Sequence, residues 1–309
     1  MSKLRKVWNA IPMVRTHLEA VTDQIYLVHG ENEGRFPRAH SILIASKETV
    51  LIDTGGGISR VQALDREFEI DYIINSHSHI DHSAGNWVFR DRRIFVPQEA
   101  FSTSGDLMAL STRFVGDVLA PIWQQFAQTQ TGFQNCRPTH SYTEDTHFRI
   151  GDVDLTPIYT PGHTIDHYCL YDAPKRILFS FDYDLTSFPW YGHQESSLVK
   201  FRHSIARLRK LPARTVVSSH RGIISSNIHS EWKTYSKHLD TRNQRILDLL
   251  DSPKTLDQLV EHKPIYRKFP YQEPLLRYWE KIMIQLHLEE LQDAGKVDQT
   301  GEKYHHQKK

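Results

Sequence analysis

The stretch His77-Ser78-His79-Ile80-Asp81-His82 contains three histidines and an aspartate, and it comes just after the apolar run at 72–74. Alternate residues leave a strand on the same face, and the turn that follows brings Asp81 and His82 around the same space. Imidazole nitrogens and carboxylate oxygens suit zinc and related divalent ions. Four ligand-type side chains within six positions therefore indicate a metal site rather than a set of ordinary core histidines.

Other apolar or β-branched runs also end in a potential metal ligand or an acid. They are the runs that lead into Asp53, His163, Asp182 and His220. Each pattern predicts a strand whose end carries a polar side chain. Taken singly, such a residue is usually an ordinary core or surface residue. The order and spacing of all the segments together indicate one shared site.

This order resembles the five motifs of the metallo-β-lactamase superfamily, over residues from about 20 to about 228. The resemblance implies a pair of metal ions. The first would be held by His77, His79 and His163, and the second by Asp81, His82 and His220, with Asp182 bridging them. Asp53 would orient the ligands from behind, and we expect His167 to support them in the same way.

The chain departs from the family pattern at the bridging aspartate. The residue before Asp182 is usually glycine but is Phe181 here, and a second acid, Asp184, lies two residues on. Asp184 is therefore an alternative bridge. Position in the motif favours Asp182.

The region before residue 100 alternates short strands with helical stretches. The expected strands are 24–29, 41–45, 49–52, 72–75 and 94–96, with a helix at 60–68 among them. This alternation is typical of an α/β domain whose sheets are covered by helices. The resemblance makes the architecture more specific: an α/β (α+β) fold built as a four-layer αββα sandwich, in a catalytic domain at residues 1–228.

A second, smaller domain is expected at residues 229–309. Its predicted elements are helices at 231–250, from the capping box at Thr255 and from Pro274, and a hairpin within 296–304. Three helices and a hairpin look like a winged helix. This tail, together with T-P-G-H-T-I-D-H at 160–167, resembles the β-lactamase-like protein 2 branch of the superfamily.

Composition narrows the setting of the protein. With 38 basic and 37 acidic residues, the formal net charge of +1 gives no electrostatic argument for nucleic acid or for an anionic membrane. No secretory signal or transmembrane stretch is recognisable, so we expect a cytoplasmic protein and not a secreted antibiotic-destroying enzyme. The two cysteines, Cys136 and Cys169, fall on no ligand position, and a homodimer is the default expectation.

Several segments are candidates for the wall of a substrate pocket. Residues 98–135 are rich in aromatic side chains and helix-like, and we expect covering helices, a lid over the site, or both. After the bridging aspartate, Trp190, Tyr191 and His193 are candidates for substrate contact. Arg221 could pair with a substrate carboxylate or phosphate, although a surface salt bridge is the simpler interpretation.

The predicted reaction is hydrolysis of an ester-type carbonyl, in a thioester, lactone or related small molecule, by a metal-bridging hydroxide. Asp81 and Asp182 would be the catalytic acids, and the cofactors would be two divalent ions, zinc first, with iron and manganese as alternatives. The alternatives from other classes are a nuclease acting on single-stranded RNA and a winged-helix nucleic-acid-binding protein. Residues 273–293 carry five acids and two bases, which disfavours contact with phosphates.

Overall fold

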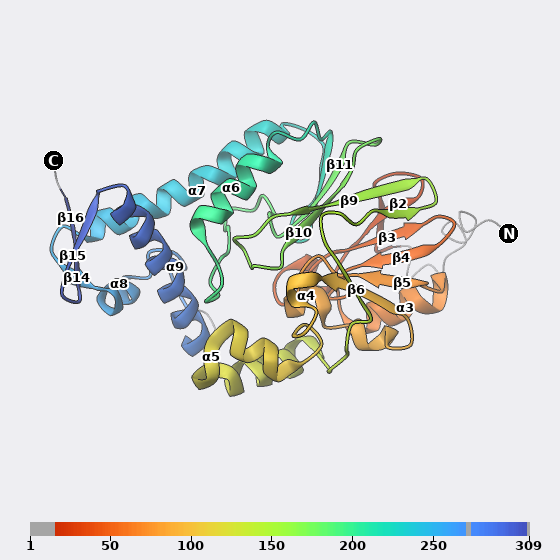
Figure 1. Cartoon of the computed structure of the whole chain (residues 1–309), viewed down its shortest axis with the longest axis horizontal. Helices are drawn as coiled ribbons and strands as arrows, with labels where there is room; N and C mark the ends of the chain where they lie inside the picture. Colours follow the sequence, from red (N-terminus) through yellow and green to blue (C-terminus); the bar gives the residue numbers. More distant parts are fainter. Residues whose placement is uncertain (1–15, 270–272, 308–309) are drawn as a thin grey trace.

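The computed structural model describes residues 16–269 and 273–307, and its main body contains two sheets (Figure 1). The first sheet has its strands in chain order. They are β1 (Leu18–Ala20), β2 (Ile25–Val28), β3 (Ser41–Ala45), β4 (Thr49–Ile52), β5 (Tyr72–Ile74), β6 (Arg93–Pro97) and β7 (His140–Tyr142). Strands β4 to β7 run parallel to one another, so their carboxyl ends share one edge of the sheet.

The second sheet has the order β13-β12-β11-β10-β9-β8. Its strands are β8 (Phe148–Ile150), β9 (Val153–Tyr159), β10 (Tyr168–Asp172), β11 (Ile177–Phe181), β12 (Thr215–Ser218) and β13 (Gly222–Ile224). Only the β11–β12 pair is parallel, and its register shifts between Phe179 and Phe181. This irregularity ends β11 just before Asp182.

The two sheets pack face to face through alternating side chains. Leu27 and Ile42 of the first sheet share one buried cluster with Leu170 and Phe179 of the second. Their chain neighbours point the other way, as the two-residue period of a strand requires: Leu43 joins a separate cluster on the outer face. The inner cluster is the central core of the molecule.

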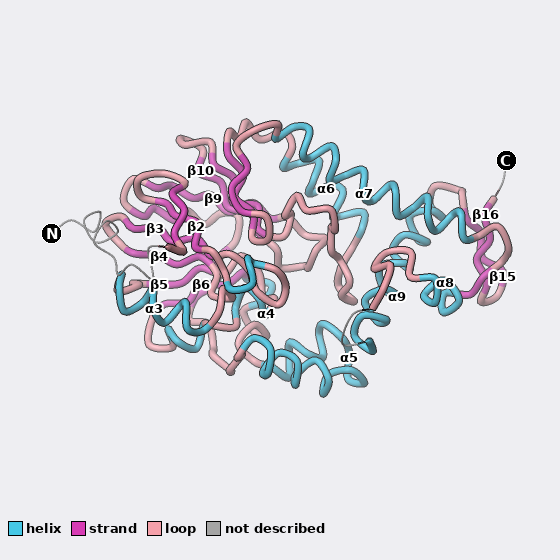
Figure 2. Tube along the Cα trace, turned by 180° about the vertical axis from the view of Figure 1, so that it is seen from behind, coloured by secondary structure: helices cyan, strands magenta, loops and turns pink. Residues whose placement is uncertain are grey.

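Helices cover both outer faces and complete four layers (Figure 1, Figure 2). Helix α3 (Ile58–Phe68) packs on the first sheet through Val61, Leu64 and Phe68. Helices α6 (Leu198–Leu208) and α7 (Ile228–Leu249) lie beside the second sheet (Figure 1). Helices α5 (Leu107–Phe126) and α9 (Glu273–Asp293) join the same apolar cluster, and α9 contacts α5, α6 and α7. The predicted four-layer αββα architecture is confirmed.

The segment after α7 contains the helices and the hairpin that the sequence predicts. It consists of β14 (Lys254–Thr255), α8 (Leu256–His262), α9, β15 (Val297–Thr300) and β16 (Lys303–His306). Thr255 and Gln258 form the expected capping box at the start of α8. The assignment of this segment to the winged-helix class, and the boundary at residue 228, stay predictions. Helix α9 contacts α5, α6, α7 and α8, so this segment shares its core with the sandwich.

Short helical turns and loops near the site also shape the molecule. They are η1 (Glu31–Gly34), α4 (Ile80–Ser83), η2 (Asn86–Phe89), η3 (Gln98–Ala100) and η4 (Ala127–Thr131). Among the described helices, none combines the length and the apolar character that crossing a bilayer requires.

Candidate metal centre

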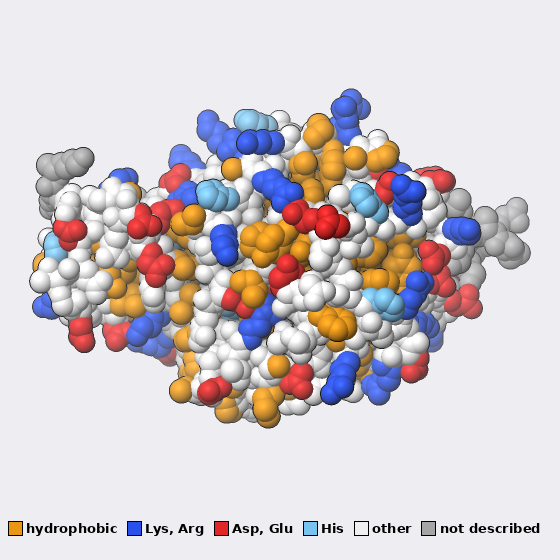
Figure 3. Space-filling view, viewed as in Figure 1, with side chains coloured by type: hydrophobic (Ala, Val, Ile, Leu, Met, Phe, Trp, Pro, Cys, Tyr) orange, Lys and Arg blue, Asp and Glu red, His pale blue; other side chains and the backbone are white. Residues whose placement is uncertain are grey.

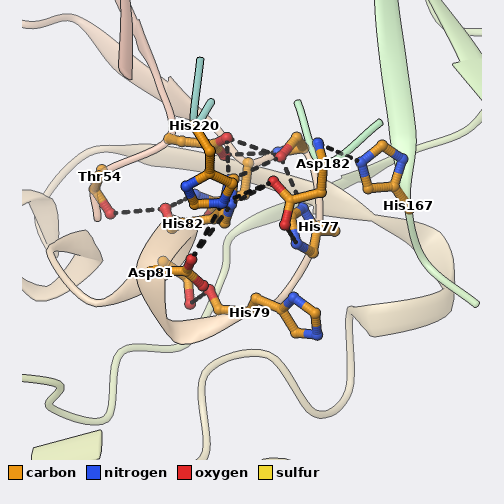
Figure 4. A network of polar contacts seen from close by, with 12 residues as sticks. Thr54, His77, His79, Asp81, His82, His167, Asp182 and His220 are labelled. Atoms are coloured by element: carbon orange, nitrogen blue, oxygen red, sulfur yellow. Dashed lines mark hydrogen bonds and ion pairs between the residues drawn. The ribbon is translucent and has the colours of Figure 1, made fainter. Parts of the chain in front are cut away.

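The predicted ligands come together at the carboxyl ends of strands from both sheets (Figure 4). They fall into two groups in which one ligand atom per residue lies within 4.8 Å of the others: His77, His79, His163 and Asp182, and then Asp81, His82 and His220. All are buried except His220, which is partly exposed. The structure thus gathers every residue that the sequence nominated as a ligand. Their role as ligands stays a prediction.

The carboxylate of Asp182 reaches both groups. Its Oδ2 atom lies 3.1 Å from His163 Nε2 and 3.8 Å from His77 Nε2. Its Oδ1 atom lies 2.9 Å from His82 Nε2 and 3.4 Å from His220 Nε2. One oxygen therefore faces each group, which is the arrangement that a bridging carboxylate needs.

Asp184, the alternative bridge, is engaged elsewhere. Its carboxylate accepts hydrogen bonds from the backbone N–H and the hydroxyl of Thr186, at 3.0 and 3.1 Å. Burial raises the pKa of Asp184 to about 6. The geometry thus supports Asp182 as the bridge.

The histidines are oriented through their second ring nitrogen. Assigned from the hydrogen-bond network, Nδ1 donates outside the cluster in three of them: from His82 to Asp53 Oδ2 (2.8 Å), from His163 to the carbonyl of Trp190 (2.8 Å) and from His220 to the carbonyl of Gly34 (2.6 Å). A proton on Nδ1 leaves the lone pair of Nε2 facing the site. These contacts therefore fix the tautomer that a metal ligand requires.

Asp53 supports two of the histidines from behind. Its Oδ1 accepts from the backbone N–H of Ser76 and its Oδ2 accepts from the Ser76 hydroxyl, both at 2.8 Å. That hydroxyl lies 3.0 Å from His77 Nδ1, so Asp53 orients His82 directly and His77 through Ser76. This is the placement that the sequence analysis expected.

His167 also lies where supporting contacts were expected. Its Nε2 accepts the backbone N–H of Asp182 at 3.3 Å, and its Nδ1 lies 2.8 Å from the hydroxyl of Thr160. Burial lowers the pKa of His167 to about 3, so the ring is neutral and can accept this hydrogen bond. His167 thus holds the backbone that carries the bridging residue.

The loop after β4 passes close behind the histidine cluster. The backbone N–H of Thr54 donates to the carbonyl of His82 at 2.7 Å. The Thr54 hydroxyl lies 3.4 Å from the same carbonyl (Figure 4). A Cβ atom on the next residue, Gly55, would lie 1.5 Å from the carbonyl oxygen of Asp81. Only glycine permits this approach, and the L-I-D-T-G motif therefore has a packing reason as well as a chemical one.

Phe181 keeps the backbone shape that glycine would adopt at this motif. Its φ angle is +49°, in the left-handed region, and its side chain is buried. An L-residue in this region costs roughly 1–2 kcal/mol. Replacement of the usual glycine by Phe181 therefore leaves the direction of the chain into Asp182 unchanged. It adds local backbone strain and a buried phenyl ring.

The residues present fit divalent metal ions. His77 Nε2 and His79 Nε2 are buried without a hydrogen-bond partner in the structure, which is costly for polar atoms unless something binds them. Burial, followed by the neighbouring histidines, lowers the pKa of His77 and of His79 well below the usual value. Burial alone would lower the pKa of His220, but Asp182 and Asp81 raise it to about 9. The neutral imidazoles of His77 and His79, beside the carboxylate of Asp182, form a donor set that suits such ions.

The metal centre opens into a cavity of about 400 Å³. Its polar floor is made of candidate ligands, and aromatic side chains form most of its walls. The lining residues are Arg35, Phe36, His79, Ile80, Asp81, Trp123, His163, Asp182, Asp184, Thr186, Phe188, Trp190, His193, His220, Tyr266, Leu276 and Trp279. Ligand pockets are commonly apolar with a few converging polar groups, and this cavity has that character.

Two of the four nominated substrate residues, Trp190 and His193, line the cavity, and the other two do not. The hydroxyl of Tyr191 lies 2.7 Å from His287 Nε2, in the interior between α7 and α9. Arg221 is paired with Glu231 at 2.6 Å, the simpler interpretation that the sequence had left open. The nomination of Tyr191 failed because successive residues of an extended segment point in opposite directions.

The sequence analysis missed the parts of the wall that come from distant segments. Phe36 follows η1, Tyr266 follows α8, and Leu276 and Trp279 lie on α9. The apolar stripe of α9 was recognised, but nothing in its spacing says which side chains face a cavity. The aromatic stretch at 98–135 contributes to the wall, since α5 carries Trp123 into the lining of the cavity and packs against α9.

Comparison with known proteins agrees with the fold. Residues 35–220, more than half of the chain, match the family model of the metallo-beta-lactamase superfamily. Lactamase-like protein aptB of Emericella nidulans is 23% identical over 266 residues, which are 81% of this chain and 72% of aptB. Human acyl-coenzyme A thioesterase MBLAC2 is 28% identical over 172 residues, 49% of this chain and 61% of that protein.

A solved structure extends the likeness to nearly the whole fold. The metallo-beta-lactamase family protein TTHA1429 of Thermus thermophilus superposes with a TM-score of 0.71 at 22% identity, covering 93% of this chain and 100% of that one. At this identity the likeness concerns the fold. Together with the family match, it shows that the chain belongs to the metallo-β-lactamase superfamily, whose members are metal-dependent hydrolases.

Proposed function

We propose that the protein is a dinuclear metal-dependent hydrolase of small molecules with an ester-type carbonyl, and that thioesters are its principal substrates. The observation that carries the proposal is the carboxylate of Asp182, which faces both ligand groups at the floor of an aromatic cavity. The likeness to a protein named as an acyl-coenzyme A thioesterase supports the choice of thioesters. Lactones are the second class to test.

Divalent ions, when bound, would provide a nucleophile at neutral pH and polarise the carbonyl oxygen. The ions would be held by His77, His79 and His163, and by Asp81, His82 and His220, with Asp182 between them. The chain itself contributes orientation and a dry environment. The contacts of Asp53, Gly34 and Trp190 fix the rings of the ligands, and the aromatic walls exclude water from the side of the substrate that does not react.

Hydrolysis of a thioester transfers a proton to the departing thiolate. Asp81 and Asp182 both line the cavity, and Oδ2 of Asp81 lies 3.6 Å from His220 Nε2. We infer that Asp81 and Asp182 are the acids nearest to the leaving group. Zinc remains the expected ion, with iron and manganese as alternatives. A cytoplasmic location and a homodimer stay predictions.

The nucleic-acid alternatives find less support. Helix α9, which would be the recognition helix of a winged helix, buries most of one face: Leu275, Trp279, Met283 and Leu291 are among its covered residues. Of its acids, Glu280 is buried and Glu290 is paired with Arg202 at 2.6 Å. On the face seen in Figure 3, basic and acidic side chains are interspersed. A protein that tracks a phosphate backbone gathers basic side chains instead.

One experiment separates these functions. The purified protein is analysed for zinc, iron and manganese, and then assayed against acyl thioesters, lactones, phosphodiesters and single-stranded RNA. We expect about two ions per chain and metal-dependent release of thiol from thioesters. Cleavage of RNA that disappears in His79→Ala, without turnover of any thioester or lactone, would overturn the proposal in favour of the nuclease.

A further inference from the structure

We propose that the segment after α7 forms the acyl-binding wall of the active site, and that Trp279 of α9 determines how large an acyl group the enzyme accepts. This inference rests on the proposed function, because it names the part of the substrate that the cavity binds. It assigns a role in substrate specificity to a segment whose sequence resembles a winged helix, a module that often binds nucleic acid.

The wall is made of side chains from four distant parts of the chain. Phe36 stacks on Phe126 of α5 with ring centroids 5.7 Å apart, and it meets Trp279 edge-on at 6.5 Å. Trp279 in turn meets Trp190 edge-on at 5.7 Å. Aromatic pairs at these separations hold one another in place. The cavity is therefore bounded on this side by a connected aromatic surface.

Trp279 is buried against the protein on one side and lines the cavity on the other; only 4% of its surface is exposed. Leu276, one turn earlier on the same face of α9, also lines the cavity. Tyr266 and Phe188 extend this apolar surface. An apolar acyl group fits such a surface, and a charged or strongly hydrated group does not.

The backbone of the Trp190 loop is adapted to this contact. A Cβ atom on Gly192 would lie 2.9 Å from Cζ2 of Trp190 and 3.0 Å from Cβ of Trp279. Glycine at this position lets the loop approach α9 closely enough for the two indoles to meet. The loop and α9 therefore pack as one unit.

A chain of buried contacts joins this wall to the metal centre. Glu280, next to Trp279 on α9, is fully buried, and its carboxylate accepts the backbone N–H groups of Ile265 and Tyr266, both at 2.9 Å. The hydroxyl of Tyr266 accepts the indole N–H of Trp190 at 2.7 Å. The carbonyl of Trp190 accepts from His163, a candidate ligand. The wall is thus held at a fixed position relative to the reacting carbonyl.

The test is the acyl-length profile of the zinc-loaded enzyme, measured as kcat/KM on a series of unbranched acyl thioesters from two to twelve carbons. Removing the indole in Trp279→Ala opens the wall. We expect the ratio of activity on the longest to activity on the shortest substrates to rise at least tenfold. Trp279→Phe, which keeps a smaller ring, should shift the ratio in the same direction by less. Each additional methylene that becomes buried contributes about 0.8 kcal/mol, which corresponds to a roughly fourfold increase in kcat/KM.

Met283→Ala is the matched control. Met283 lies one turn after Trp279 on α9 and is fully buried, but it does not line the cavity. It should lower stability without changing the profile. Tyr266→Phe removes only the hydroxyl that holds Trp190, and it should broaden the profile while the ring remains.

A second measurement does not depend on hydrolysis. Binding of non-hydrolysable alkyl thioethers of the same lengths is followed by calorimetry in the wild type and in Trp279→Ala. We expect the length of tightest binding to increase in the variant. A profile and a binding optimum that stay at the wild-type length in Trp279→Ala overturn the inference. Absence of turnover on every thioester in the wild type would instead overturn the proposed function, and the binding series would still decide whether Trp279 forms the wall.

Discussion

The Nδ1 atom of His163 lies 2.8 Å from the carbonyl oxygen of Trp190, so a candidate metal ligand and a wall of the cavity are joined by one hydrogen bond. The indole side chain of Trp190 contacts Trp279 and Tyr266. A displacement of Trp279 is therefore transmitted to His163 through two contacts, its own contact with Trp190 and the hydrogen bond from His163 to Trp190. Trp190 thus joins the wall of the cavity to the candidate metal centre.

Loss of the bridging carboxylate should remove the metal centre. In Asp182→Ala, we expect most bound metal and nearly all hydrolysis to be lost, because both groups lose the oxygen that faces them. His79→Ala should behave in the same way. Elemental analysis and thioester turnover measure both effects. Asp184→Asn is the matched control and should retain its metal; the reverse result, with full metal content in Asp182→Ala, would assign the bridge to Asp184.

Asp53→Asn should weaken metal binding without unfolding the protein. The variant keeps the size of the side chain but removes the charge that orients His82 and, through Ser76, His77. Changes behind a ligand typically cost 10–100-fold in metal affinity. Competition with a chelator measures the affinity. Ser76→Ala leaves the direct contact between Asp53 and His82 in place and should have a smaller effect, so equal losses in both variants would contradict this account.

Arg113→Met should destabilise the fold strongly. In the interior, Arg113 on α5 donates to Asp166 at 2.7 Å and to Glu195 at 2.5 Å. Asp166 also accepts the backbone N–H of Ser78, which lies in the sequence between two candidate ligands. Leaving Asp166 as an unpaired buried charge costs about 3–5 kcal/mol. Urea unfolding measures the change in the free energy of unfolding.

The control for this prediction is Arg207→Met. Arg207 pairs with Glu144 at 2.7 Å, but both side chains are largely exposed. Exposed pairs contribute about 0–1 kcal/mol. A similar loss of stability in the two variants would mean that burial of the Asp166 pair has little effect. Partial recovery of stability by Asp166→Asn in the Arg113→Met background would support the prediction that an unpaired buried charge causes the loss.

His40 should make the fold less stable in mild acid. Burial lowers the pKa of His40 to about 4 from 6.5, and its neutral Nδ1 accepts the backbone N–H of Gly30 at 3.0 Å. Between these two values the unfolded chain binds the proton and the folded chain does not, so this contribution to stability falls as the pH falls from 6.5 toward 4.

The size of this effect is at most about 3.5 kcal/mol, since one pKa unit corresponds to about 1.4 kcal/mol. Urea unfolding at several pH values between about 4 and 7 measures the slope. His40→Gln keeps an acceptor for Gly30 without the titration, and its stability should depend less on pH in this range. Identical slopes in wild type and variant would show that other buried histidines dominate the acid response.

The sequence predicted much of the first sheet and every candidate ligand, because these features are local. The runs at 41–45 and 49–52 match β3 and β4, and ligands that follow strand ends meet wherever those ends share an edge. β10 was not predicted. Its sequence, Tyr168–Asp172, has no alternation because both of its faces are covered, and periodicity cannot separate such a run from other buried segments.

The wall of the cavity could not be predicted in the same way. Phe36 and Trp279 are 243 positions apart, and neither belongs to a motif. Their contact depends on the packing of α9 against α5, which is a property of the whole fold. Tyr191 and Arg221 were nominated by proximity to a motif along the chain, and proximity along the chain does not determine which way a side chain points.

The single apolar cluster that α5, α6, α7 and α9 share sets a limit on how this enzyme can be taken apart or rebuilt. A chain cut after residue 228 would remove α7 and α9 from this cluster and would uncover the apolar side chains of α5 that pack against α9. Such a fragment would be prone to aggregate as well as to lose selectivity. A redesign that keeps this metal centre and changes the specificity must therefore exchange α5 and α9 together.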